Sequence, residues 1–204
     1  MHFQQHGVCN VEPFIIKGVE ANYPKIDQPY HFSQKENRSV ACDAHAENAA
    51  YELNVRLTPE QTSELWAKMQ AAWQEGRDES WPDSIEPSFK KDGDFYEVKT
   101  RRKASYGPPL QRFADNSEAP ADFKLTSGSI VNVAVQFVPY KMRDHGVALR
   151  LMGVQVLKYV EFKPPSPFDA VDGYTGSTTA APTDDPFAEF NSAATVEPSS
   201  NFSF

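Results

Sequence analysis

Cysteine, long apolar runs and, towards the C-terminus, positive charge are all scarce in this sequence of 204 residues. The two cysteines, Cys9 and Cys42, are too few for a disulfide framework and indicate free thiols in a reducing compartment. No run approaches the ~18 apolar residues of a membrane span, and the segment Met1 to Asn10 lacks the apolar core of a signal peptide. These absences predict a soluble cytosolic protein that does not contact a membrane.

Positive charge is absent from the last part of the chain. Between Pro164 and Phe204 there is no Lys or Arg, and six acidic residues give this segment −6 of the formal net charge of −8. Ser, Thr, Ala, Pro and Asp dominate it, a composition that buries too little apolar surface to fold alone. We therefore expect a folded domain over residues 1–163 and an acidic disordered tail over 164–204, which avoids or mimics a polyanion.

Two long apolar runs, Ile130 to Tyr140 and Val147 to Val160, flank a short polar link and predict two strands joined by a tight turn. In the first run apolar residues recur at every second position, as in a strand with one buried side. The second run is apolar on both faces, and Gly153 within it fits a sharp bend. Such a strand is expected near the centre of a curved sheet or closed barrel.

Three further strands are predicted upstream. They are Pro13 to Val19, which Pro24 follows and terminates, Ala49 to Leu57, and Phe95 to Lys103, which begins after a turn at Asp92-Gly93. The segments between them, Ser33 to Asn48 and Leu110 to Ser127, are polar and aperiodic, so we interpret them as a loop and a long connection.

One helix is predicted directly after the strand that ends at Leu57. Thr58, Pro59 and Gln61 form the capping-box sequence of a helix start, and Gly76 is the predicted end. A single apolar stripe follows at helical spacing: Leu65, Trp66, Met69, Ala72 and Trp73. We expect both tryptophans to lie in the core. Five strands and one helix predict a mainly β fold, an OB-fold-like five-stranded barrel.

The strand Phe95 to Lys103 is the most basic stretch of the chain. OB barrels bind single strands by stacking bases on aromatic rings and by tracking phosphates with Lys and Arg. The candidate DNA-binding residues are Tyr96, Lys99, Arg101, Arg102, Lys103, Tyr106, Tyr140, Lys141, Arg143 and Arg150. The pattern leaves open which face of this strand points outward, and an exposed edge strand kept soluble by cations is the alternative interpretation.

Isolated phenylalanines beside acidic residues mark the tail, as in Asp184-Asp185-Pro186-Phe187 and at the C-terminal Phe202-Ser203-Phe204. They predict short motifs that dock into a basic-rimmed apolar pocket of a partner protein, with a solvated linker as the alternative. The candidate partner-binding residues are Asp184, Asp185, Phe187, Phe190, Phe202 and Phe204.

Two short motifs suggest other chemistry. Pro82-Asp83 and Glu97-Val98-Lys99 have the spacing of metal-dependent PD-ExK nucleases, although two long strands follow where those enzymes have a helix. His6 with Cys9, and Cys42 with His45, have zinc-ligand spacing, but both pairs lie in polar segments, so we expect no metal and no cofactor. No Ser-His-Asp set or phosphate-cradling glycine loop can be assigned, and we expect no enzymatic activity.

Several short motifs of the predicted barrel occur together in one known family. They are Tyr23-Pro24, Gly128-Ser129, Pro139-Tyr140, Gly146 to Leu151 and Val154 to Val156. This set resembles the single-stranded DNA-binding proteins of tailed-phage replication systems, over most of residues 11–162. The resemblance implies an OB-fold and a C-terminal tail, ending in phenylalanine, that contacts the replisome.

The resemblance also implies a function. We expect a sequence-independent protein that coats and protects single-stranded DNA in phage DNA replication, recombination and repair, in the cytoplasm of the infected bacterial host. Its tail would recruit replication proteins such as a polymerase, helicase or primase. The sequence leaves open whether the protein forms a homodimer. The alternatives are a metal-dependent nuclease of the PD-ExK type and a protein-interaction module whose basic strand never meets DNA.

Overall fold

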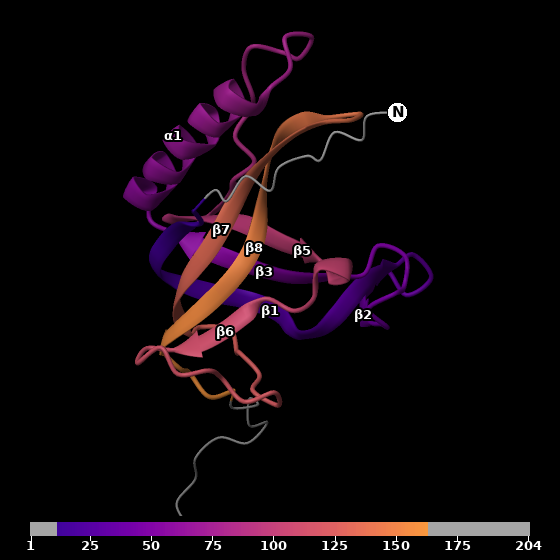
Figure 1. The fold of residues 1–204 in the computed structure, drawn as a ribbon. Helices are drawn as coiled ribbons and strands as arrows, with labels where there is room; N and C mark the ends of the chain where they lie inside the picture. Colours follow the sequence, from indigo (N-terminus) through magenta and orange to yellow (C-terminus); the bar gives the residue numbers. More distant parts are fainter. Residues whose placement is uncertain (1–11, 163–204) are drawn as a thin grey trace, which may run out of the picture. The chain divides into compact units, whose positions relative to one another are not determined.

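The computed structural model describes residues 12–162, which form a β-barrel with one α-helix packed onto it (Figure 1). The strands are β1 (Phe14–Ser33), β2 (Arg38–Ala41), β3 (Ala50–Leu57), β4 (Lys90–Asp92), β5 (Phe95–Lys103), β6 (Leu110–Phe113), β7 (Ile130–Lys141) and β8 (His145–Lys158). The helix α1 spans Pro59–Gly76, and a 3-10 turn covers Ala104–Tyr106. No helix among residues 12–162 combines the length and apolar character needed to cross a membrane.

Five long strands close the barrel. They neighbour one another in the order β5, β3, β1, β7, β8, all antiparallel, and a parallel contact of β5 with β8 joins the two ends where Arg101 lies opposite Arg150. The short strands extend this frame: β2 pairs with β1, β4 with β5, and β6 with β8. The predicted OB-fold-like barrel with one helix is therefore confirmed.

The apolar character of both faces of β8 has a geometric cause. Val147, Leu149 and Leu151 are buried in the first half of the strand, whereas Val154 and Val156 are buried in the second half. Between them a bulge interrupts the pairing with β7 and shifts the buried face by one residue. Gly153 lies at this bulge, and a Cβ atom there would come within 3.0 Å of the Leu110 carbonyl oxygen of β6. The glycine is thus needed for the close approach of a neighbouring strand.

The predicted helix is confirmed with its cap. The Gln61 backbone N–H donates to the Thr58 hydroxyl (3.3 Å), and the Gln61 side chain accepts from the Thr58 N–H (2.9 Å). Leu65, Met69 and Trp73 are buried in the core, as expected. Trp66, which was also expected in the core, is only half-buried at its edge, and its ring lies 6.2 Å from that of Phe89.

Three predictions about the strands were wrong. The strand predicted to end before Pro24 continues to Ser33, because register shifts between Asn22 and Tyr30 place the proline in an irregular stretch, where the ladder does not need its missing N–H. The segments predicted as a loop and a connection contain β2 and β6. Both are four residues long, and β6 is held by parallel pairing with β8, about 40 residues away, so no local periodicity marks it.

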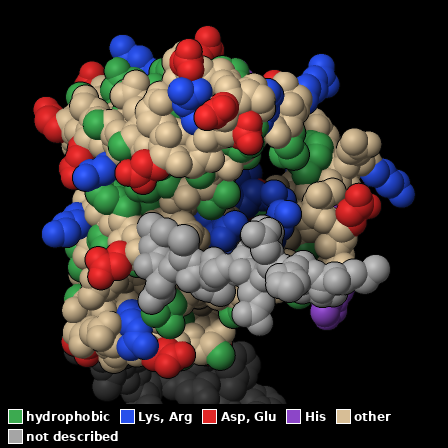
Figure 2. Space-filling view, turned by 45° about the horizontal axis from the view of Figure 1, so that its top comes forward, with side chains coloured by type: hydrophobic (Ala, Val, Ile, Leu, Met, Phe, Trp, Pro, Cys, Tyr) green, Lys and Arg blue, Asp and Glu red, His purple; other side chains and the backbone are tan. Residues whose placement is uncertain are grey.

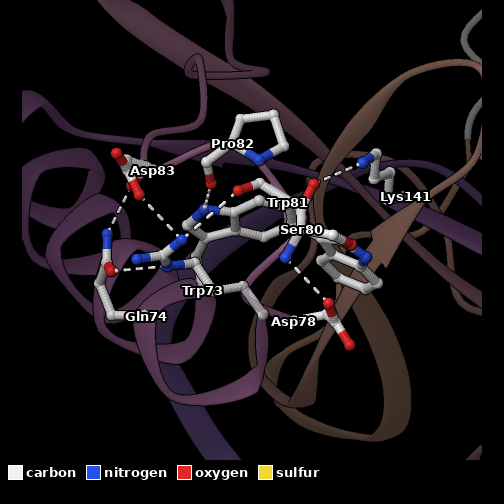
Figure 3. Close-up of polar contacts among 9 residues, drawn as sticks. Trp73, Gln74, Asp78, Ser80, Trp81, Pro82, Asp83 and Lys141 are labelled. Atoms are coloured by element: carbon white, nitrogen blue, oxygen red, sulfur yellow. Dashed lines mark hydrogen bonds and ion pairs between the residues drawn. The ribbon is translucent and has the colours of Figure 1, made fainter.

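The irregular segment after α1 is tied to the helix and to β7 by the contacts drawn in Figure 3. The Trp73 indole N–H donates to the Pro82 carbonyl (3.1 Å), and Gln74 donates to the Asp83 carbonyl (2.7 Å). The Trp81 ring lies 5.3 Å from the Trp73 ring. Lys141 donates from its ammonium group to the Ser80 carbonyl (2.9 Å), so this segment contacts the β7–β8 hairpin (Figure 3).

Candidate nucleic-acid interface

The pleat of β5 determines which of its basic side chains reach solvent. Val98 and Thr100 point into the barrel and are buried, so Lys99, Arg101 and Lys103 point outward and are exposed. This settles the question of facing that the sequence left open, and it places three cations in one row.

These three cations line a groove of about 570 Å³ between β5 and the β7–β8 hairpin. Tyr106, Tyr140 and Arg150 also line it, so the groove brings together six of the ten predicted DNA-binding residues. Its apolar wall includes Val138, Val147 and Leu149. Figure 2 shows Lys and Arg side chains gathered in a hollow of the surface with hydrophobic side chains beside them.

Tyr106 is placed as an exposed aromatic platform at this groove. The 3-10 turn Ala104–Tyr106 carries it, and 53% of the residue is exposed. The Arg150 guanidinium lies 5.1 Å from the ring centroid, which is cation–π distance. Arg150 also donates to the Gln136 side chain (3.3 Å), so both the ring and the cation beside it are held in place.

The remaining four predicted residues lie outside the lining of the groove. Arg102 lies on the same side of β5 as the buried Val98 and Thr100. Its guanidinium donates to the carbonyls of Tyr106 (2.6 Å) and Gly107 (2.8 Å). Tyr96 lies on that same side, is half-buried and pairs with Leu57 of β3. Lys141 contacts Ser80, and Arg143 is exposed in the turn between β7 and β8.

Comparison with known proteins gave matches in three-dimensional structure alone, since no family model and no curated protein sequence matches this chain. The single-stranded DNA-binding protein of bacteriophage Enc34 in complex with ssDNA superimposes with a TM-score of 0.57 at 12% identity, covering 74% of this chain and 89% of that chain. Gp2.5, a single-stranded DNA-binding protein encoded by bacteriophage T7, gives a TM-score of 0.56 at 15% identity over 81% of this chain and 99% of that chain.

The fold is that of phage single-stranded DNA-binding proteins. The resemblance expected from the sequence is thereby confirmed at the level of the fold. It extends over most of the chain, although few side chains are shared.

Sequence reasoning missed several residues beside the predicted ones. Glu52 of β3 contacts both Lys99 and Arg101 on the outer face of the barrel. On the far side of those cations a cavity of about 810 Å³ is lined by Tyr30, His31 and Phe32 of the β1–β2 hairpin. Phe32 is exposed. The only sequence feature that could have pointed to this cavity is the run of three aromatic rings at residues 30–32. Their position beside Lys99 and Arg101 depends on the pairing of β1 with β2, which no local pattern marks.

The residues of the nuclease motif have separate partners. Asp83 forms an ion pair with Arg77 (2.9 Å) in the segment after α1, whereas Glu97 on β5 accepts from the amides of Asn22 (2.6 Å) and Asn54 (3.1 Å). The motif's lysine, Lys99, contacts Glu52. Across residues 12–162, no three His, Cys, Asp or Glu side chains are grouped as they would be to hold a metal ion.

Of the candidate zinc ligands, Cys42 and His45 lie within the described residues. The pKa of the Cys42 thiol is raised, mainly by burial and to a smaller extent by the negative charge of Asp43. A raised thiol pKa disfavours the thiolate that binds zinc. His6 and Cys9 lie outside the described residues, and so do the tail candidates at positions 184–204.

Proposed function

We propose that this protein binds single-stranded DNA without sequence preference and without enzymatic activity. One observation carries the proposal: Lys99, Arg101, Lys103 and Arg150 line a single groove together with Tyr106 and Tyr140. This combination matches the two requirements of single-strand binding, cations that track phosphates and aromatic rings on which bases stack. The same fold in the Enc34 protein has been solved in complex with ssDNA, which supports the assignment.

The chemistry of the groove favours tolerance of sequence. Tyr106 is exposed and Tyr140 also lines the groove, and every base has a π-face that can stack on an aromatic ring. Lys103 and Arg150 have no acidic partner among residues 12–162, so they are available to phosphate oxygens. Affinity should therefore come from stacking and counterion release, with little reading of base edges.

The biological setting is a finer part of the proposal. A protein of this kind would coat and protect single strands during phage DNA replication, recombination and repair in the host cytoplasm. The segment 164–204, with its −6 charge and its phenylalanines, would recruit a polymerase, helicase or primase. Homodimer formation is compatible with this role.

The test compares binding of fluorescent oligo(dT) and duplex DNA in Mg²⁺. We expect retention of the single strand, weaker binding of the duplex and no cleavage; cleavage would favour the nuclease. The triple variant K99Q/R101Q/K103Q should lose most of its affinity at physiological salt, whereas K17Q/K68Q/K158Q, which removes three exposed charges outside the groove lining, should bind nearly as the wild type does. Equal affinities of the two triple variants would contradict the proposal.

A further inference from the structure

Glu52 lies among the groove cations, and its carboxylate is unusually enclosed for a surface acid. One of its oxygens lies 2.7 Å from Lys99 Nζ and 3.3 Å from Arg101 Nε, and only 16% of the side chain is exposed. Both cations therefore share one carboxylate oxygen. Of the acids described in this structure, Glu52 is the one that contacts two residues of the groove.

The strand register explains this placement. Glu52 of β3 pairs with Lys25 of β1 on one side and with Arg101 of β5 on the other, and Arg101 pairs in turn with Arg150 of β8. Side chains at paired positions of adjacent strands project from the same face, so a row of charges crosses the outside of the barrel. Glu52 is the single negative charge in that row, and without it the cations would repel one another.

We infer that Glu52 occupies the place of a DNA phosphate and sets the affinity for single-stranded DNA by competing for Lys99 and Arg101. The inference rests on the proposed function. A phosphate that contacts these two cations must displace the carboxylate or remain beside a like charge, and either event weakens binding. Glu52 thus stabilises the free protein and limits the strength of the complex.

The isosteric variant E52Q tests this directly, because it removes the charge and keeps the shape. For oligo(dT) at low salt we expect about a 2- to 30-fold lower Kd, the equivalent of two ion pairs that no longer have to be broken. The dependence of log K on log[salt] should steepen by up to about 1.4, since each freed cation contributes about 0.7 on a single strand. The melting temperature of the DNA-free protein should fall.

E97Q is the matched control. Glu97 lies on the same outer face, on β5, but it accepts from two asparagine amides and lies outside the groove lining. Its removal changes net charge equally, so we expect a Kd within about twofold of the wild type. If E52Q and E97Q lowered the Kd equally, the change in net charge alone would explain the effect, and the inference would be overturned.

A second measurement separates this inference from the proposed function. K99Q should weaken binding more in the E52Q background than in the wild type, because Lys99 contributes fully only when its carboxylate partner is gone. Wild-type binding with an unchanged or weaker E52Q variant would overturn the role of Glu52 alone. A wild-type protein that does not bind single-stranded DNA would overturn the proposed function, and this inference with it.

Discussion

Arg101 and Arg102 are adjacent in sequence and differ in role because successive side chains of a strand point to opposite faces. Arg101 faces the groove, whereas the Arg102 guanidinium donates to the backbone carbonyls of Tyr106 and Gly107. These bonds hold the turn that carries the Tyr106 ring. Arg102 is thus placed to position an aromatic platform, and it is not placed to contact phosphate.

We therefore predict that R102M weakens oligo(dT) binding as much as Y106A does, by about 1–3 kcal/mol, the usual value of one stacked base. Its salt dependence should match that of the wild type, because no phosphate contact is lost. Fluorescence anisotropy at several salt concentrations measures both quantities. The double variant R102M/Y106A should bind no more weakly than either single variant.

K103Q provides the contrast to R102M. It removes a groove cation, so the log–log salt slope should fall by about 0.7. A comparable fall in R102M would show that Arg102 contacts phosphate after all. Thermal melting of every variant checks that binding is compared between folded proteins.

The helix α1 contributes to the core through one face, and its two tryptophans differ in burial. Trp73 is fully buried and donates its indole N–H to Pro82, whereas Trp66 is half-buried at the edge of the core. Seven residues apart, they lie on one side of the helix without being equivalent, because Trp81 and His145 cover only Trp73.

We predict that W73A destabilises the protein by about 3–5 kcal/mol, the cost of emptying a large buried aromatic site. W66A serves as the matched control and should cost clearly less. Urea denaturation measures both free energies of unfolding. Loss of DNA binding by W73A without loss of stability would contradict the core assignment.

The segment after α1 should give a small acid-sensitive contribution. Asp78 accepts from the Ser80 backbone N–H (2.9 Å), and this bond, with smaller effects of the Ser80 hydroxyl and Lys141, lowers the pKa of the Asp78 carboxyl. A lowered folded-state pKa stabilises the protein above the unfolded pKa of about 3.9, and the contribution is lost as pH falls through the folded value.

The stability of D78N should therefore be lower than that of the wild type at neutral pH, and the difference should disappear as the pH falls through the lowered folded-state pKa of Asp78. Thermal melting across pH 2–7 tests this, with D94N, an exposed Asp in the β4–β5 turn, as the control. A difference between wild type and D78N that is constant over this pH range would exclude the carboxylate bond as its source.

The whole chain combines a nearly neutral body with a C-terminal segment that carries −6. We expect such a tethered segment to compete with DNA for the groove at roughly millimolar effective concentration. We predict that deletion of residues 164–204 leaves the barrel folded and strengthens oligo(dT) binding modestly, most clearly at low salt, where screening is weak. Association with a replication partner should be lost.

Substitution of Phe187, Phe190, Phe202 and Phe204 by alanine separates these two effects. The acids remain, so DNA affinity should stay that of the full chain while partner binding in a pull-down is lost. Weaker DNA binding after truncation would show that the segment belongs to the binding surface or to a dimer interface.

The sequence alone was sufficient for the elements whose signal is local. The capping box and apolar stripe of α1, and the alternation in β3 and β7, predicted those elements nearly to the residue, because hydrogen bonds and burial within each element follow a short period. The turn at Asp92-Gly93 likewise marked the start of β5. The same patterns led to the barrel and to the basic strand, and with them to the DNA-binding hypothesis.

The tertiary structure decided what depends on residues far apart in the chain. The pairing of β6 with β8, the closure of the barrel at Arg101 and Arg150, and the outward face of β5 all follow from strand register. So does the contact of Glu52 with Lys99, 47 residues away, which no local pattern marks. Register is set by the cooperative burial of one continuous core, so only the folded chain distinguishes Arg101, which lines the groove, from Arg102, which holds the turn that carries Tyr106.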